Sequence, residues 1–221
     1  MNDRDPLAPA DDLDPRQRLV VAAIDQIEKH GIGQLTVRKL AAAAGVNIAA
    51  VNYYFRSKEA LVAAALEGSI RNMLSDSEDF LARMPGDPLE ALSGLLGYYL
   101  EGGMRYPNVG RALLHDAFHA DDYSGPFPKL FAPVMERLRD LVRAAVPGLE
   151  ERAAARRVVA ALSAVFFPTF FAGLYEGLSA LGSPADRLAY ARELARQTLA
   201  PAAVPEPAAP APPRGRPQKR G

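Results

Sequence analysis

The residues best suited to chemistry are polar and cationic side chains gathered between residues 36 and 58. Thr36, Asn47 and Ser57 each precede a run with helical spacing, which is the position of an N-terminal cap. Unpaired backbone amides at a helix start, with a short polar side chain beside them, favour an anion such as a phosphate. Arg38 and Lys58 add positive charge next to these helix starts. The segment therefore predicts a surface that binds phosphate groups.

Three short helices are expected to position these side chains. The first covers 15–30, because Asp14 can cap it, proline suits its first position and Gly31 can end it. The second is predicted over 37–44 and the third over about 48–54, with a glycine breaking the chain between them. Two short helices joined by a tight turn, with a third in front, form a helix-turn-helix whose last helix can enter the major groove of DNA.

The third of these helices has side chains that can read DNA bases. Ala49 and Ala50 are small enough to let the helix approach base edges and to contact thymine methyl groups. Asn47 and Asn52 can both donate and accept hydrogen bonds. Residues 16–60 contain seven basic and three acidic residues, although the whole chain has a formal net charge of zero. The basic excess is therefore local to the predicted helix-turn-helix.

The stretch LTVRKLAAAAGVNIAAVNYYFRSKEALV resembles the DNA-binding domain of TetR-family transcriptional regulators, and the resemblance covers roughly residues 16–62. It implies an all-α homodimer with an N-terminal three-helix DNA-binding domain and a C-terminal helical domain for ligand binding and dimerisation. It further implies a repressor that a small-molecule effector releases from a palindromic operator in double-stranded DNA. A protein of another class, a helical ligand-binding or scaffold protein without specific DNA binding, is the alternative.

The helix starts and the resemblance together assign ten residues to DNA binding. They are Thr36, Val37, Arg38, Asn47, Ile48, Ala49, Ala50, Asn52, Tyr53 and Lys58. By resemblance, Tyr53 and Lys58 contact phosphates, and Thr36 and Arg38 contact the opposite strand.

The rest of the chain reads as longer helices, with no alternating strand pattern. They are expected over 58–84, after Pro88, over 110–119, over 128–146, over 149–181 with a kink at Pro168, and over 184–199. The domains predicted from this are a disordered acidic arm (1–13), the DNA-binding domain (14–60), a ligand-binding and dimerisation domain (61–200) and a disordered, proline-rich basic tail (201–221).

Aromatic residues are dense in the predicted ligand-binding domain. They can line an apolar pocket or form ordinary core, and a pocket of this kind predicts a largely apolar effector. The residues selected as ligand contacts are Tyr98, His115, Phe118, Phe131, Phe167 and Phe170.

Several classes of site are absent from the sequence. The chain has no cysteine, which excludes disulfides, thiolate zinc sites, iron-sulfur clusters and a thiol nucleophile. It has no phosphate-binding loop, no GxSxG and no GxGxxG, so no enzyme activity and no cofactor are predicted. His115 and His119 share a helix face, but two histidines without a third ligand do not predict a metal site.

Two stretches allow a second interpretation. Residues 158–175 carry no charge and are long enough to cross a membrane. Ser163 and Pro168, however, lower the hydrophobicity of this stretch, which favours a buried helix of a protein that does not bind a membrane. The N-terminus has no apolar signal segment, so a cytoplasmic location is expected. In the tail, Arg214-Gly215-Arg216 between prolines resembles an AT-hook that binds the minor groove; the alternative is a solvated tail.

Overall fold

The computed structural model describes residues 13–175 and 180–202, and these residues form helices and connecting turns without a β-strand. The N-terminal part comprises α1 (Pro15–His30), η2 (Ile32–Gln34), α2 (Val37–Ala43) and α3 (Ile48–Phe55). The C-terminal part comprises α4 (Lys58–Arg83), α5 (Pro88–Arg105), α6 (Pro107–Leu113), α7 (His115–Ala120), α8 (Pro126–Ala145), α9 (Glu151–Phe170), η3 (Ala172–Leu174) and α10 (Pro184–Thr198). The predicted all-α fold class is confirmed for these residues. The AT-hook-like segment and most of both predicted tails lie outside them.

The helices of the N-terminal part begin at the predicted caps. The Asp14 carboxylate accepts the Gln17 amide hydrogen at 2.8 Å, and the Gln17 side chain accepts the Asp14 amide hydrogen at 3.0 Å, which completes a capping box. Thr36 and Ser57 cap α2 and α4 in the same way through their hydroxyl oxygens. These boundaries depend on side chains within four residues of each other, which is why sequence alone predicts them.

Two predicted helices in the C-terminal part are wrong in extent. The helix expected over 110–119 is two helices, because Pro107 opens α6 earlier and the chain leaves helical geometry at Leu114. The helix expected over 149–181 ends at Phe170, two residues after Pro168. Proline has no amide hydrogen for the carbonyl of Ala164, four residues earlier, and the Tyr190 hydroxyl of α10 donates to that carbonyl instead, at 3.1 Å.

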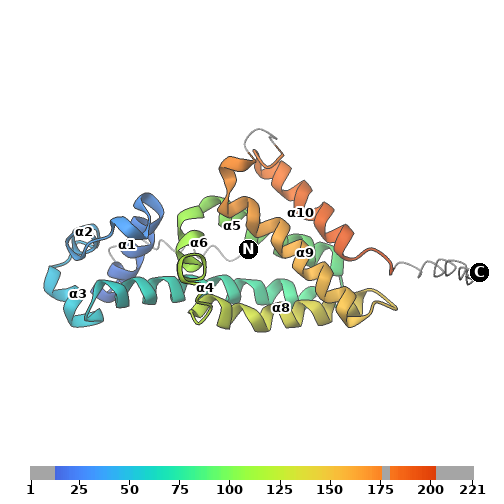
Figure 1. Ribbon diagram of the computed structural model, residues 1–221, viewed down its shortest axis with the longest axis horizontal. Coiled ribbons are helices and arrows are strands. Elements are labelled where there is room, and N and C mark those ends of the chain that lie inside the picture. The colour runs from blue at the N-terminus through green and yellow to red at the C-terminus, as the bar shows by residue number, and fades with distance from the viewer. Residues whose placement is uncertain (1–12, 176–179, 203–221) are drawn as a thin grey trace, which may run out of the picture.

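Two hydrophobic cores lie along one long helix, α4 (Figure 1). The N-terminal core combines buried residues of α1, α2 and α3 with Leu61 and Leu66 from the first half of α4, and it also includes Val109 and Ala112 of α6. The C-terminal core combines Leu81, from the last turn of α4, with buried residues of α5, α8, α9 and α10. Since one continuous helix contributes to both cores, a movement of α4 in one of them is transmitted to the other. The domain boundary near residue 60 remains a prediction.

Helix α9 is the one described helix that is long and apolar enough to cross a membrane. One face of α9, however, is buried inside the protein. Ala154, Val158, Leu162 and Val165 on that face all belong to the C-terminal core. A helix in the core of a bundle and a helix in a membrane are both removed from water, so both can be apolar along their whole length. The packing favours the core interpretation of this segment.

A carboxylate joins α1 to α6 beside the N-terminal core. Glu28 Oε2 accepts the amide hydrogens of Asn108 at 3.0 Å and Val109 at 3.1 Å. The Asn108 side chain in turn donates to the Glu28 carbonyl at 2.8 Å. Burial raises the pKa of the Glu28 carboxyl above its ordinary value, and the two backbone hydrogen bonds oppose that rise. This cluster, called the Glu28 bridge below, links the N-terminal helices to α6.

Replacing Glu28 tests what the Glu28 bridge contributes to stability. Glu28→Ala leaves the amides of Asn108 and Val109 without their acceptor, and we expect the free energy of unfolding to fall by about 1–3 kcal/mol. Because the folded pKa is raised, the folded state binds the proton more tightly, so the contribution of Glu28 to stability falls as pH rises from the unfolded pKa through the folded one. Denaturant unfolding at several pH values should show that the free energy of unfolding declines less with rising pH in Glu28→Gln than in the wild type. An equal pH dependence in the two proteins would contradict the raised pKa of Glu28.

Two adjacent glycines of α5 provide a matched test of helix packing. A Cβ at Gly103 would lie 2.6 Å from Thr169 Cγ2 and 2.8 Å from Thr169 Cβ, whereas a Cβ at Gly102 meets nothing within 4 Å. We expect Gly103→Ala to destabilise the protein by about 1–3 kcal/mol through overpacking. Gly102→Ala should stabilise it by roughly 0.5–1 kcal/mol, because alanine favours the helix. Thermal unfolding of both variants checks the opposite signs, and a loss of stability in both would contradict the close packing of α5 on Thr169.

Candidate nucleic-acid interface and ligand pocket

A tight turn fixes the angle between α2 and α3. Gly45 adopts a positive φ of 62°, which a residue with a side chain rarely adopts, and the Val46 amide donates to the Ala41 carbonyl at 3.0 Å. Leu40 on α2 and Val51 on α3 are fully buried, and they hold the two helices against α1 and α4. The glycine and the apolar residues together give a rigid helix-turn-helix.

The two N-terminal caps of this motif use polar atoms of the predicted DNA contacts. Thr36 Oγ1 accepts the Lys39 amide hydrogen at 3.2 Å, and Asn47 Oδ1 accepts the Ala49 amide hydrogen at 3.0 Å. These bonds occupy acceptor capacity only, so the Thr36 hydroxyl and the Asn47 amide group keep donors for another partner. The capping role and a role in phosphate binding are therefore compatible.

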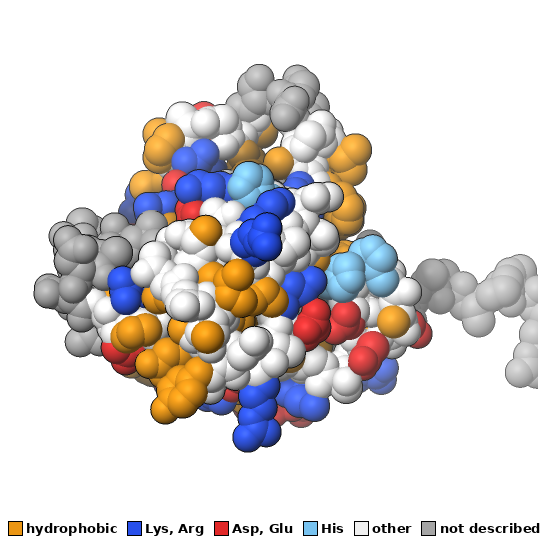
Figure 2. Space-filling view, turned by 90° about the vertical axis from the view of Figure 1, so that its left-hand side faces the viewer, with side chains coloured by type: hydrophobic (Ala, Val, Ile, Leu, Met, Phe, Trp, Pro, Cys, Tyr) orange, Lys and Arg blue, Asp and Glu red, His pale blue; other side chains and the backbone are white. Residues whose placement is uncertain are grey.

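Helix α3 buries one face and exposes the other. Val51 and Phe55 point into the N-terminal core, whereas Asn52 and Tyr53 are exposed, and the Tyr53 side chain is 81% exposed. Other exposed or half-buried residues predicted to contact DNA continue this surface: Thr36, Val37, Arg38, Asn47, Ile48, Ala49 and Ala50. Figure 2 faces this end of the molecule and shows separate Lys and Arg side chains among exposed hydrophobic ones, with Asp and Glu mainly toward the sides.

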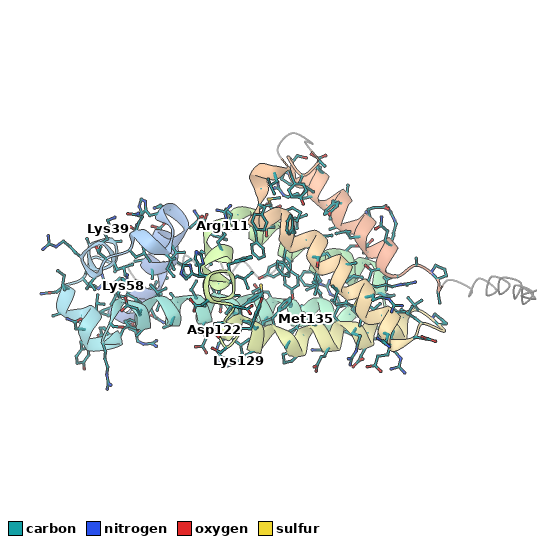
Figure 3. The ribbon with its side chains drawn as sticks, viewed as in Figure 1. Lys39, Lys58, Arg111, Asp122, Lys129 and Met135 are labelled. Carbon is teal, nitrogen blue, oxygen red and sulfur yellow. The ribbon has the colours of Figure 1, made fainter. Side chains whose placement is uncertain are left out.

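Two lysines of this end are tied to backbone carbonyls (Figure 3). Lys39 Nζ donates to the Gln34 carbonyl at 3.0 Å, and Lys58 Nζ donates to the Leu35 carbonyl at 3.4 Å. Lys58 also lies 3.6 Å from the Glu59 carboxylate. Lys58 therefore connects the start of α4 to the segment that precedes α2, in addition to presenting a charge.

Sequence reasoning missed one cation beside α3. Arg18 of α1 lines an open hollow with Gly45, Ala49 and Tyr53, and its buried Nε has no hydrogen-bond partner among the residues that the structure describes. The position of Arg18 in the first turn of α1 did not indicate a role in DNA binding, because only the tertiary fold brings α1 beside the turn between α2 and α3.

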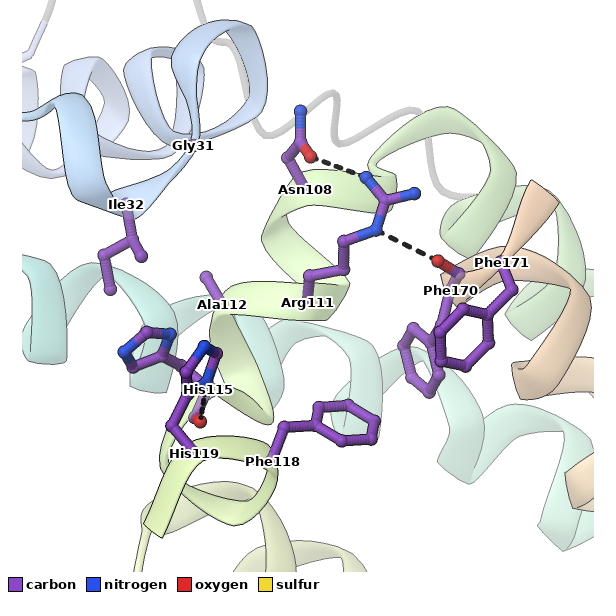
Figure 4. A pocket seen from close by; sticks show the side chains of 10 residues that line it. All are labelled: Gly31, Ile32, Asn108, Arg111, Ala112, His115, Phe118, His119, Phe170 and Phe171. Carbon is purple, nitrogen blue, oxygen red and sulfur yellow. Dashed lines mark hydrogen bonds between the residues drawn. The ribbon is translucent and has the colours of Figure 1, made fainter. Parts of the chain in front are cut away.

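A pocket of about 330 Å³ lies between the N-terminal helices and the C-terminal bundle (Figure 4). Three of the predicted ligand contacts meet there: His115, Phe118 and Phe170. The remaining lining residues were not predicted: Gly31, Ile32, Asn108, Arg111, Ala112, His119 and Phe171. The lining positions from 108 to 119 follow one another at spacings of one or three residues, and this periodicity was the available signal in the sequence.

The other three predicted ligand contacts lie outside this pocket. Tyr98 donates to Asp76 Oδ2 at 2.8 Å, and burial raises the pKa of its hydroxyl well above the ordinary value. Phe131 is buried in the C-terminal core, where it stacks on Phe127 with ring centroids 5.2 Å apart. Phe167 is 48% exposed and lies against Phe171 with centroids 4.7 Å apart. These contacts give each of the three side chains a structural partner.

The two histidines of the pocket lie close together on α7. The His115 and His119 rings stack with centroids 4.2 Å apart, and His119 Nδ1 lies 2.8 Å from the His115 carbonyl. No group of three potential metal ligands occurs within residues 13–175 and 180–202. The two histidines contribute a pair of stacked imidazole rings to the lining of the pocket.

Comparison with known proteins connects this geometry to a family. Residues 19–65 match the family model for bacterial regulatory proteins of the tetR family. The HTH-type transcriptional regulator AcrR of Shigella flexneri is 28% identical over 110 residues, which are 50% of this chain and 51% of AcrR. The chain thus spans about half the length of this curated relative.

Solved structures extend the likeness to nearly the whole fold. A TetR transcription regulator from Haloarcula marismortui aligns with a TM-score of 0.62 at 22% identity, over 84% of this chain and 96% of that one. The transcriptional regulator FadR of Bacillus subtilis, in complex with stearoyl-CoA, aligns with a TM-score of 0.58 at 14% identity, over 83% and 97%. At these identities the structures show a shared fold.

The match of the N-terminal domain covers the helix-turn-helix formed by α2 and α3, and the fold of the remaining helices agrees with solved regulators. Within residues 19–65 the chain is therefore similar to bacterial regulatory proteins of the tetR family.

Proposed function

We propose that this protein is a cytoplasmic, homodimeric transcriptional repressor that binds a palindromic operator and is released by a small-molecule effector. The observation that carries the proposal is the rigid α2–α3 motif, whose second helix exposes Asn52 and Tyr53 while burying its other face. A helix exposed in this way fits the major groove of DNA. The family's role in regulation supports the same function and gives no support to an enzyme.

Each side chain in the proposed interface has a role that follows from its position. The donors of Asn47 and Asn52 would read base edges, and the small side chains of Ala49 and Ala50 would allow the close approach. Tyr53, Arg38 and the other residues at the rim would contact phosphates, which fix the register of the helix. Lys58 would add charge while it holds the start of α4 in place.

The outer face of α9 supports the homodimer. Val159 is 63% exposed and Phe167 is 48% exposed, and Ala160 and Ser163 between them are also exposed. The four residues repeat at helical spacing and form an exposed stripe of apolar and small side chains on α9. A second copy of the same helix would cover this stripe in an isologous, two-fold interface. Such a dimer would present two α3 helices to the two half-sites of a palindrome.

The pocket between the domains supports regulation by a ligand. Its lining takes Gly31 and Ile32 from the N-terminal part and Arg111 and Phe170 from the C-terminal part. A ligand that binds one arrangement of the two parts more tightly would shift the population toward that arrangement. The solved complex of the relative FadR with stearoyl-CoA supports an organic effector here as well.

Two substitutions distinguish a charged from an uncharged phosphate contact in the DNA complex. An operator is first selected from random duplexes with the purified full chain. We expect Arg38→Ala to weaken operator binding at least about tenfold. The plot of log K against log salt concentration should also become less steep by about two, because each subunit of the dimer loses one phosphate contact. Tyr53→Ala should weaken binding with little change of slope, because tyrosine carries no charge. Fluorescence anisotropy at several salt concentrations measures both.

The control is Arg71→Ala, which removes an exposed arginine from α4 outside the proposed interface. It should leave affinity and slope unchanged. If no duplex is enriched, or if all three variants bind like the wild type, the scaffold alternative replaces operator binding.

A charge on the α9 stripe tests the dimer. We expect Val159→Arg to convert the dimer to a monomer, because the interface would bury an unpaired charge. Met135→Arg is the control: Met135 is 37% exposed on α8, a helix that contributes no residue to the stripe. Sedimentation velocity at micromolar protein gives the mass of each. A dimeric Val159→Arg variant, or a wild type that sediments as a monomer, would contradict the proposed interface.

A further inference from the structure

We propose that the pocket between the two parts of the protein binds an organic anion with an apolar body, such as an aromatic or aliphatic carboxylate, and that Arg111 is its anchor. The proposal gives a chemical class to the effector, and its regulatory meaning rests on the proposed function. It also alters the sequence-based expectation of a largely apolar effector by adding a required negative charge.

The guanidinium of Arg111 is held in place without being neutralised. Its Nε donates to the Phe170 carbonyl at 3.0 Å, and its Nη1 donates to Asn108 Oδ1 at 2.8 Å (Figure 4). Both acceptors are uncharged, and neither bond uses Nη2. Within residues 13–175 and 180–202, Arg111 has no ion-pair partner within 4.0 Å. A positioned arginine with an unused donor matches a carboxylate better than a neutral ligand.

The other polar groups of the lining agree with a negative ligand. The stacked imidazoles of His115 and His119 supply ring nitrogens that donate when protonated, and no aspartate or glutamate is among the lining residues that the structure describes. The acidic group that acts on Arg111 from outside the lining is Glu28, whose carboxylate accepts the two amide hydrogens of the Glu28 bridge. A ligand carboxylate would thus be the first anion inside the pocket.

Aromatic side chains provide the site for the apolar body. Phe118 is 60% exposed, and its ring meets Phe171 edge to face with centroids 6.4 Å apart. Phe170 lies beside them at the end of α9. Covering a large exposed ring removes apolar surface from water, which favours a ligand with a ring or a short acyl chain beside its charge. The volume of about 330 Å³ suits a small ligand of this type.

The position of the pocket explains how the anion would act on DNA binding. Asn108 bonds to Arg111 within the pocket and also takes part in the Glu28 bridge to α1. A carboxylate that binds Arg111 is therefore linked through Asn108 to Glu28, which holds α6 against α1. The same ligand touches Gly31 and Ile32, which directly follow α1.

The test compares a carboxylate with its uncharged isostere on the full-length protein. 2-Naphthoate and 2-naphthamide have nearly the same shape, so a difference in their affinities reports the charge. We expect calorimetric titration to show naphthoate binding at least about tenfold more tightly, the ratio expected for one charge-assisted hydrogen bond. Arg111→Gln should abolish that ratio, and the matched change Arg71→Gln on the exposed face of α4 should preserve it.

A second variant guards against misfolding of Arg111→Gln, which also removes the bond to Phe170. Phe118→Ala alters an exposed ring and should weaken both probes while keeping their ratio. Equal affinity of the two probes for the wild type, no binding of either, or a preserved ratio in Arg111→Gln would overturn the proposal.

Operator binding is measured separately on the same preparations, with and without naphthoate. Wild-type protein that binds its operator but does not discriminate the probes refutes the anion site and leaves the proposed function intact. Discrimination by a protein that binds no operator supports the anion site and refutes the proposed function.

Discussion

The structure depends on the continuity of α4 through two hydrophobic cores. Leu61 and Leu66 are buried with α1, α2 and α3, and Leu81 is buried with α5, α8 and α9. A helix of 26 residues is about 39 Å long, and it cannot bend sharply without breaking backbone hydrogen bonds. The orientation of the helix-turn-helix is therefore coupled to the C-terminal bundle, because a rotation of α4 must move both.

The Glu28 bridge adds a second connection between the two parts, of a different physical kind. Along α4 the parts are joined by a covalent helix and apolar packing, whereas at α6 the apolar packing of Val109 and Ala112 is supplemented by hydrogen bonds to one partly buried carboxylate. Apolar packing is insensitive to small ligands on the surface, but a hydrogen-bonded cluster beside a pocket can be rearranged by a charged one. This contrast makes α6, rather than α4, the element on which an effector would act first. Arg111, one turn further along α6 than Asn108, is placed to do so.

The shared fold and the low identity of the solved relatives have a common physical explanation. The helices need only buried apolar residues at helical spacing, which many sequences supply, so structures at 22% and 14% identity align over more than four-fifths of this chain. The pocket has no such tolerance, because its charge depends on single side chains. A specific effector therefore follows from residues such as Arg111 and Phe118 and not from the fold.

The sequence by itself determined the all-α class, the starts of the N-terminal helices and the helix-turn-helix, because caps such as Asp14 and Thr36 act on amides three residues away. Only the tertiary structure decided which side chains form the pocket. Arg111 and Phe170 are 59 residues apart in sequence, Glu28 and Asn108 are 80 apart, and no periodicity in one helix encodes such pairs. The aromatic density was equally consistent with core and pocket, and packing placed Phe131 in the core and Phe118 at the pocket.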